Sequence, residues 1–327
     1  MAELRYNPVT REWIMIASHR QSRPNMPEGY CPFCPGSGKV PDSGYTTFIY
    51  PNDFPALSQN PPAPDDVASG PFQARPAYGV CEVLLYSDCH TATLGGLSDD
   101  HIRSLAEMWR DCFNRIASDE KIKYVYIFEN RGEAVGVTMP HPHGQVYGYS
   151  YIPKKLEEEA ASASEYFIEN GRNLYLDLLE GEKKDGRRIV FENRYFTAYV
   201  PFFSQVAYGL HVMANRRVPH LGLMSAEELY ALGETVRECA GMYDCLFDKK
   251  FPYMMCMHNA PVNSGNFEEY WQFHVEFIPP MRTSDTQQFF ASSETGAGAW
   301  CNPTSPEEKS SELRAAHDKY LKIQMRR

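Results

Sequence analysis

Five consecutive residues in the middle of the chain, His141-Pro142-His143-Gly144-Gln145, have the types and spacing for phosphoryl chemistry. A neutral imidazole attacks a phosphoanhydride and forms a reactive phosphoramidate, which makes His143 a candidate nucleophile. Gly144 leaves room for a substrate close to the backbone. Gln145 can donate a hydrogen bond to the phosphoryl oxygen as charge shifts in the transition state. The alternative is a pair of ordinary core or surface histidines beside a proline turn.

A β-strand must present these side chains together. Alternation along a strand that starts at the motif and runs through residues 147–153 would put His141, His143 and Gln145 on one face. Residues 80–86 and 124–128 are predicted to be buried strands. Between them, Ser98 is a predicted N-cap, and apolar residues at three- and four-residue spacing over 102–116 predict a helix. Residues 59–77 are rich in Pro, Gly and Ala and are predicted to be a loop.

The same order of elements occurs a second time. Residues 209–213, 252–257 and 273–279 are predicted strands, and a capping box at Ser225 and Glu228 starts a predicted helix. We interpret this as a diverged duplication of residues 45–153 and 190–280, with domains at 1–180 and 181–327. Two such halves would join edges into one extended, mainly antiparallel sheet with helices packed on it, an α+β fold. A chance similarity of two strand-helix-strand units is the alternative.

Composition limits the class of protein. The 327 residues are 43% hydrophobic and 13% aromatic, which is typical of a globular chain of about two domain-sized units. A net charge of -10 without a basic run argues against a nucleic-acid partner. The early charges and the lack of long apolar stretches favour a cytoplasmic protein without a signal peptide or membrane span. Nine cysteines indicate reduced thiols rather than a disulfide framework.

The motif and its surroundings resemble the galactose-1-phosphate uridylyltransferase family of the histidine triad superfamily. The resemblance covers nearly the whole chain and is carried by residues 5–8, 31–34, 52–57, 128–132, 139–145 and 270–274. It implies a homodimer and a ping-pong reaction. UDP-glucose would transfer its uridylyl group to His143 and release glucose 1-phosphate. Galactose 1-phosphate would then accept the group to give UDP-galactose.

The resemblance also implies substrate contacts. Phosphate contacts are expected at Arg20, Arg23, Asn130, Thr138 and Gln145, nucleoside contacts at Asn52, Asp53 and Phe54, and contacts to the partner subunit's sugar around Gln288 and Phe289. Many family members have Lys at position 288, so the preference for sugar and base is less firmly implied than the chemistry. Without the resemblance, the two arginines would be a solvated pair, and residues 51–54 a turn.

Two metal sites are implied. Cys31-x-x-Cys34 is half of a tetrahedral zinc site, and the resemblance adds His90 and His141 as the other ligands. Zinc would then anchor His141 and hold the adjacent nucleophile in register. A second site is implied at Glu159, His258, His274 and Glu276, although the family has a histidine at the last position. Iron, manganese or no ion would suit it equally, and His274 and Glu276 also fit the polar face of a half-buried strand.

The resemblance therefore implies a zinc-bearing UDP-glucose—hexose-1-phosphate uridylyltransferase. One alternative is an ADP-sugar or dinucleoside polyphosphate phosphorylase of the same superfamily, because its histidine chemistry would look the same. The other is a zinc-stabilised nucleotide-binding protein without turnover.

Overall fold

The computed structural model describes residues 2–22, 29–66, 68–137 and 139–326. Its main feature is a nine-stranded sheet in which all neighbouring strands pair antiparallel. In spatial order the strands are β3 (Phe48–Pro51), β5 (Gly79–Leu85), β7 (His143–Tyr149), β6 (Tyr124–Arg131), β11 (Tyr253–His258), β12 (His274–Ile278), β10 (Leu210–Ala214), β9 (Phe196–Tyr199) and β8 (Ile189–Glu192). The predicted α+β class is confirmed.

The sheet is built from two similar halves joined at its centre. Outward from the β6–β11 pair, one side reads β6-β7-β5-β3 and the other reads β11-β12-β10-β9. Along the chain, each half forms two strands, then a long helix, then two more strands. The strands are β3 and β5 before the helix and β6 and β7 after it in one half, and β9 and β10 before it and β11 and β12 after it in the other. The two halves are joined by antiparallel pairing of β6 with β11, from Ile127 opposite Met257 to Arg131 opposite Tyr253. This arrangement confirms the predicted extended sheet of duplicated halves.

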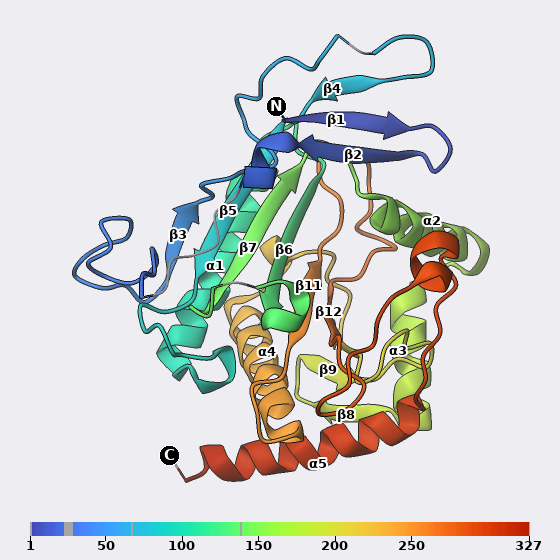
Figure 1. Ribbon diagram of the computed structural model, residues 1–327. Coiled ribbons are helices and arrows are strands. Elements are labelled where there is room, and N and C mark those ends of the chain that lie inside the picture. Colours follow the sequence, from blue (N-terminus) through green and yellow to red (C-terminus); the bar gives the residue numbers. More distant parts are fainter. Residues whose placement is uncertain (1, 23–28, 67, 138, 327) are drawn as a thin grey trace.

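The two long helices are α1 (Asp99–Ala117) and α4 (Ala226–Leu246), and both lie on one face of the sheet (Figure 1). Ser98 caps α1 by accepting a hydrogen bond from the backbone of His101, and the predicted capping box at Ser225 starts α4. The predicted apolar stripe of α1 is buried along its whole length. One hydrophobic core connects both halves, so the predicted boundary between residues 180 and 181 stays a prediction.

Further elements surround this framework. A small sheet has the order β2-β1-β4 and consists of β1 (Ala2–Asn7), β2 (Glu12–Ala17) and β4 (Ala74–Pro76). Three helices, α2 (Lys154–Asn170), α3 (Leu174–Asp185) and α5 (Pro306–Gln324), and short turns η1 (Ser18–Ser22), η2 (Leu94–Gly96), η3 (Glu133–Val135), η4 (Leu221–Leu223) and η5 (Ser292–Gly296) complete the chain. The predicted loop 59–77 was wrong at its end, because β4 pairs with β1 there. Among the described residues, no helix has the length and apolar character needed to cross a membrane.

The strand that carries the candidate nucleophile begins later than predicted. β7 starts at His143 and ends at Tyr149, so His141 lies outside the strand, and its predicted place in the strand row was wrong. Pro140 and Pro142 flank His141 and have no N–H to donate to a ladder. The carbonyl of Pro142 still accepts a hydrogen bond from the N–H of Tyr86 at 3.1 Å. His141 therefore lies outside the sheet and faces the cluster of candidate metal ligands described below.

Candidate active site and metal centre

His143 stands at the first position of β7, the third of the nine strands in spatial order. Its Nδ1 lies 2.7 Å from the carbonyl oxygen of His141. Because a carbonyl only accepts, this hydrogen bond places the proton of the neutral ring on Nδ1 and the lone pair on Nε2. The ring is thus oriented by its own backbone, with the proton on Nδ1.

Gly144 explains why the strand can pass so close to its neighbours at this point. A Cβ on Gly144 would lie 2.2 Å from the hydroxyl oxygen of buried Tyr86 and 3.0 Å from the carbonyl of Phe128. The glycine therefore serves packing on the helix-covered face of the sheet, where Val146 also joins the core. His143 and Gln145, which alternate with these residues, are part-exposed on the opposite face.

A cavity of about 270 Å³ opens beside His143 on this second face. Most of the residues expected to bind the nucleotide line it: Arg20, Asn52, Asp53, Phe54, Asn130, His143 and Gln145. Four distant chain segments thus meet at one place, as the resemblance implied. The size and the mixture of aromatic and polar side chains suit a nucleotide.

The segment 51–54 is both a turn and a wall of this cavity, so the two interpretations of it are compatible. Asn52 Oδ1 accepts a hydrogen bond from the N–H of Phe54 at 2.9 Å, which closes an Asx turn. The Tyr50 hydroxyl donates to Asp53 Oδ2 at 2.9 Å, and Lys39 Nζ lies 3.2 Å from the same oxygen. The carboxylate of Asp53 is therefore held in position by two neighbours before any ligand binds.

Several lining residues were not anticipated from the sequence: Phe33, Tyr50, Val83, Phe128 and Tyr147. Strand alternation could have predicted two of them. Phe128 stands two residues from Asn130 on one strand, and Tyr147 stands two residues from Gln145 on the next, so each pair lies on the same face. Phe33 lies between the two cysteines of the metal centre, and its ring centroid is 5.6 Å from that of His143.

Four expected contact residues are not placed at the site. Arg23 and Thr138 lie outside the described residues. Gln288 is buried and bound within its own chain: its Oε1 accepts from the N–H of Ala207 at 3.3 Å, and its Nε2 donates to the carbonyl of Cys301 at 3.4 Å. Phe289 is 76% exposed. Neither of these last two residues lines the cavities around His143.

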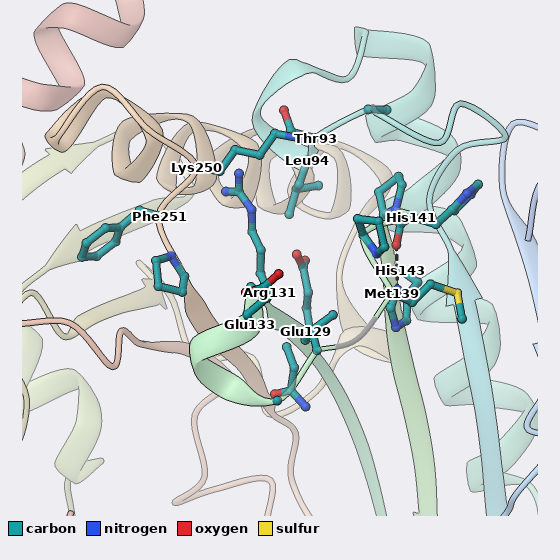
Figure 2. A pocket seen from close by; sticks show the side chains of 18 residues that line it. Thr93, Leu94, Glu129, Arg131, Glu133, Met139, His141, His143, Lys250 and Phe251 are labelled. Atoms are coloured by element: carbon teal, nitrogen blue, oxygen red, sulfur yellow. Dashed lines mark hydrogen bonds between the residues drawn. The ribbon is translucent and has the colours of Figure 1, made fainter. Parts of the chain in front are cut away.

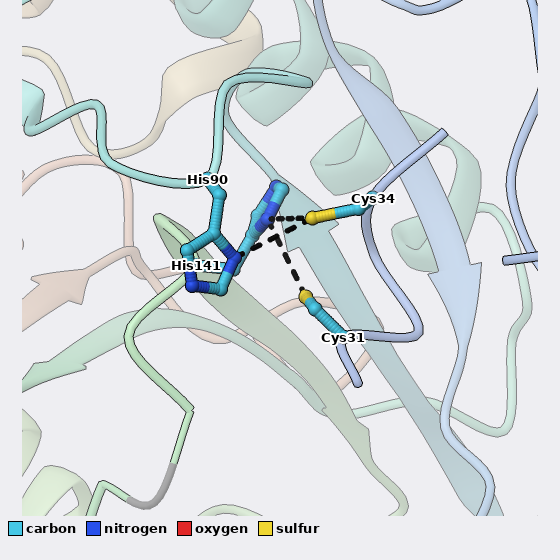
Figure 3. A group of neighbouring side chains, drawn as sticks. All are labelled: Cys31, Cys34, His90 and His141. Carbon is cyan, nitrogen blue, oxygen red and sulfur yellow. Dashed lines mark hydrogen bonds between the residues drawn. The ribbon is translucent and has the colours of Figure 1, made fainter. Parts of the chain in front are cut away.

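The predicted zinc ligands Cys31, Cys34, His90 and His141 converge, as Figure 3 shows. The Nδ1 atom of His141 lies 3.6 Å from the sulfur of Cys31 and 3.7 Å from that of Cys34, and His90 Nδ1 lies 3.4 Å from Cys34. Zinc–sulfur and zinc–nitrogen bonds of ordinary length in a tetrahedron give sulfur–nitrogen distances of about 3.6 Å. The four side chains therefore fit a tetrahedral zinc ion.

The imidazole of His141 is oriented for this role. Its Nε2 donates to the carbonyl of Ser87 at 2.7 Å, which leaves the lone pair on Nδ1, the atom that faces both sulfurs. Burial lowers the pKa of His141 to about 4, so the ring is neutral at physiological pH. The carbonyl of His141 in turn accepts a hydrogen bond from His143, so the candidate metal centre and the candidate nucleophile share one short segment.

A second group of donors comes together in the other half of the sheet. Glu159, His258, His274 and Glu276 bring one ligand atom each to within 4.8 Å of one another. His274 is the first residue of β12, as His143 is of β7. The cluster therefore occupies the position in the second half that the nucleophile occupies in the first. Lys155 and His211, which were not anticipated, also contact it.

A larger cavity of about 530 Å³ adjoins the other side of the nucleophile segment (Figure 2). Glu129 and Arg131 of β6 line it together with Lys250 and His143. Arg131 makes a two-bond ion pair with Asp244 at 2.8 and 2.9 Å. Glu129 is only 5% exposed; its Oε1 accepts from the Tyr253 hydroxyl at 3.1 Å, and burial raises its pKa to about 7.

This buried acid predicts a dependence of stability on pH. An acid with a higher pKa in the folded state binds its proton more tightly when folded. The free energy of unfolding should therefore fall as pH rises from about 5 through 7, by roughly 3 kcal/mol at most. Glu129→Gln should flatten this fall and be more stable than wild type at pH 8. Urea unfolding at several pH values measures the free energy of unfolding, and the less buried Glu133→Gln is the control. The same change of this free energy with pH in wild type and in Glu129→Gln would contradict the prediction.

The fold and the site can be compared with those of known proteins. A duplicated antiparallel sheet presents a histidine whose Nδ1 is bound to a carbonyl beside a cavity lined by aromatic and polar side chains. Residues 1–153 match the family model "Galactose-1-phosphate uridyl transferase, N-terminal domain", and residues 159–297 match its C-terminal counterpart. The chain belongs to the galactose-1-phosphate uridyl transferase family of nucleotidyltransferases.

Individual relatives agree with this assignment. Galactose-1-phosphate uridylyltransferase of Thermotoga maritima is 38% identical over 315 residues, covering 96% of this chain and 98% of the relative. The rat (Rattus norvegicus) enzyme is 30% identical over 95% of this chain and 86% of its own. A solved uridylyltransferase structure has a TM-score of 0.90 at 29% identity, covering 97% and 99% of the two chains. An ADP-glucose phosphorylase from Arabidopsis thaliana, with TM-score 0.74 and 21% identity over 96% and 98%, shares the fold.

Proposed function

We propose that this enzyme is a UDP-glucose—hexose-1-phosphate uridylyltransferase that works through a uridylyl-histidine at His143. The observation that carries the proposal is the orientation of His143, whose Nδ1 is bound to the carbonyl of His141 while its ring borders the nucleotide-sized cavity. The family assignment supplies the substrates, UDP-glucose and galactose 1-phosphate.

The reaction has two displacements at one phosphorus. In the first, His143 Nε2 attacks the α-phosphorus of UDP-glucose, the bond to the bridging oxygen breaks, and glucose 1-phosphate leaves with that electron pair. In the second, a phosphate oxygen of galactose 1-phosphate attacks the same phosphorus. The N–P bond breaks, His143 recovers its lone pair, and UDP-galactose is released. No proton needs to leave Nδ1, which the carbonyl of His141 holds throughout.

The cavity residues have distinct roles in this proposal. Phe54 stacks on uracil, and Asn52 and Asp53 bond to the base or ribose from their fixed turn. Asn130 and Gln145, on adjacent strands beside His143, donate to the phosphoryl oxygens. Arg20 neutralises phosphate charge from η1. The contacts implied for Arg23, Thr138, Gln288 and Phe289 remain part of the proposal, the last two within a homodimer.

We also propose that zinc is held by Cys31, Cys34, His90 and His141, and that the enzyme works in the cytoplasm. When bound, zinc supplies a structural anchor and no step of the transfer. What it fixes is the position of His141, whose carbonyl orients the nucleophile.

Labelled nucleotide sugars test the proposed substrates. The protein is incubated without acceptor, in parallel, with α-labelled UDP-glucose and with ADP-glucose, and the adduct on the protein is measured. Label from UDP-glucose, discharged by galactose 1-phosphate to UDP-galactose, is the expected result. Label from ADP-glucose alone, discharged by inorganic phosphate, would instead establish an adenylyl phosphorylase. Binding of either nucleotide without an adduct or product would establish a non-catalytic protein.

A further inference from the structure

The second donor cluster differs from the metal centre in the way its side chains point. In the metal centre, His141 directs one nitrogen to the sulfurs and anchors the other on a carbonyl. His258 instead faces an acid with each nitrogen: Nδ1 is 3.1 Å from Glu159 Oε2, and Nε2 is 3.6 Å from Glu276 Oε2. His258 therefore lies between two carboxylates, with an acid beside each nitrogen.

The remaining imidazole does keep the arrangement of a ligand. His274 Nδ1 lies 3.0 Å from the carbonyl of Gln272, and its Nε2 is 4.0 Å from both carboxylates. The cluster thus contains only one histidine that is oriented as in the zinc centre. The position at which the family resemblance expects a further histidine holds Glu276.

A lysine brings a positive charge to both carboxylates of this cluster. Lys155 lies one helical turn before Glu159 in α2, and its Nζ is 2.6 Å from Glu276 Oε2 and 3.8 Å from Glu159 Oε1. The side chain of Lys155 is 56% exposed and that of Glu276 only 11%, so the lysine reaches from the surface to a buried carboxylate. An ammonium group has no lone pair for a metal and repels a divalent cation at this distance.

We propose that Lys155 replaces the second metal ion in this chain. A buried carboxylate needs a nearby cation. The Glu276 side chain, present where a metal-binding histidine is expected, is what brings the ammonium of Lys155 into the cluster. The ion pair ties α2 to β12, a link that the metal would otherwise make through Glu159 and the strand residues. The donor set as arranged fits an ammonium group and not a divalent metal ion.

Metal uptake tests the replacement. Wild type is treated with excess Fe(II) under anaerobic conditions, and separately with Zn(II), desalted and analysed for metal. The cluster should take up no ion, so a His274→Ala variant should hold the same metal as wild type. The double variant Lys155→Ala/Glu276→His should gain about one further ion per chain, and Fe(II) should raise its melting temperature but not that of wild type. A wild-type ion that is lost in His274→Ala but kept in Cys31→Ser would overturn the proposal.

Stability gives a second test that does not require the double variant to fold. Lys155→Gln should lower the melting temperature by several degrees, and the loss should largely disappear in a Glu276→Gln background, because the two groups act as a pair. The matched control is Lys154→Gln, which breaks a more exposed pair with Glu158 at 3.6 Å. Equal losses for the two lysine variants would contradict the proposed role. Turnover of Glu276→Gln should stay near that of wild type, since no residue of this cluster lines the cavities beside His143.

Discussion

His143→Ala should abolish the uridylyl adduct and lower transfer between UDP-glucose and galactose 1-phosphate by at least about ten-thousand-fold. The reason is chemical. A carboxylate at this position would be repelled by the anionic phosphate, and a lysine would be mostly protonated at neutral pH. Only an imidazole is largely neutral there and also leaves readily from phosphorus. The backbone carbonyl of His141 orients this one ring, so a side chain elsewhere cannot take over its function.

Isotope exchange isolates the step that His143 performs. With UDP-glucose and labelled glucose 1-phosphate but no galactose 1-phosphate, wild type should exchange label, because the first displacement runs in both directions. The adduct should be labile in acid, stable in base and located on the peptide that contains His143. His101→Ala, a change in the first turn of α1, should leave exchange unchanged. Exchange by His143→Ala at a rate comparable to wild type would show that the mechanism is not covalent at this residue.

The two long helices were predicted best from the sequence, because their signals lie in neighbouring residues. Helix caps at Ser98 and Ser225, with apolar stripes behind them, located α1 and α4, since both signals depend on nearby residues. The duplicated order of elements then indicated one sheet with two halves. Cys31, Cys34, His143 and Gln145 were marked by their own motifs, and the other metal and nucleotide residues came from the family resemblance. The structure brings together all of those it describes except Gln288 and Phe289.

What the sequence could not provide depends on contacts between distant segments. The ion pair of Lys155 with Glu276 joins residues 121 positions apart, so no local pattern marks it. Strand β4, which pairs with β1 in the small sheet, is formed from residues that were predicted to be the end of a loop. The start of β7 was placed too early because strand alternation takes no account of the two prolines around His141, which remove ladder donors.

Cys31→Ser should lower both the zinc content and the melting temperature of the enzyme. Metal binding free energy is in part folding free energy, because the unfolded chain has no preformed site. Here the four ligands come from three separate segments, at residues 31–34, 90 and 141, so the ion crosslinks loops that are far apart in the chain. A loss of about 3 kcal/mol would lower the melting temperature by roughly 4–5 °C in a chain of this size.

The matched control for this loss is Cys89→Ser, which removes an exposed thiol next to His90 that is not among the four ligands. Metal analysis should find about one zinc ion per chain in wild type and in Cys89→Ser, and well under half an ion in Cys31→Ser. Activity should fall with the metal, because His141 loses its anchor and its carbonyl no longer fixes the ring of His143. Full stability and turnover in a rigorously metal-free preparation would show that these four side chains hold the nucleophile segment without zinc.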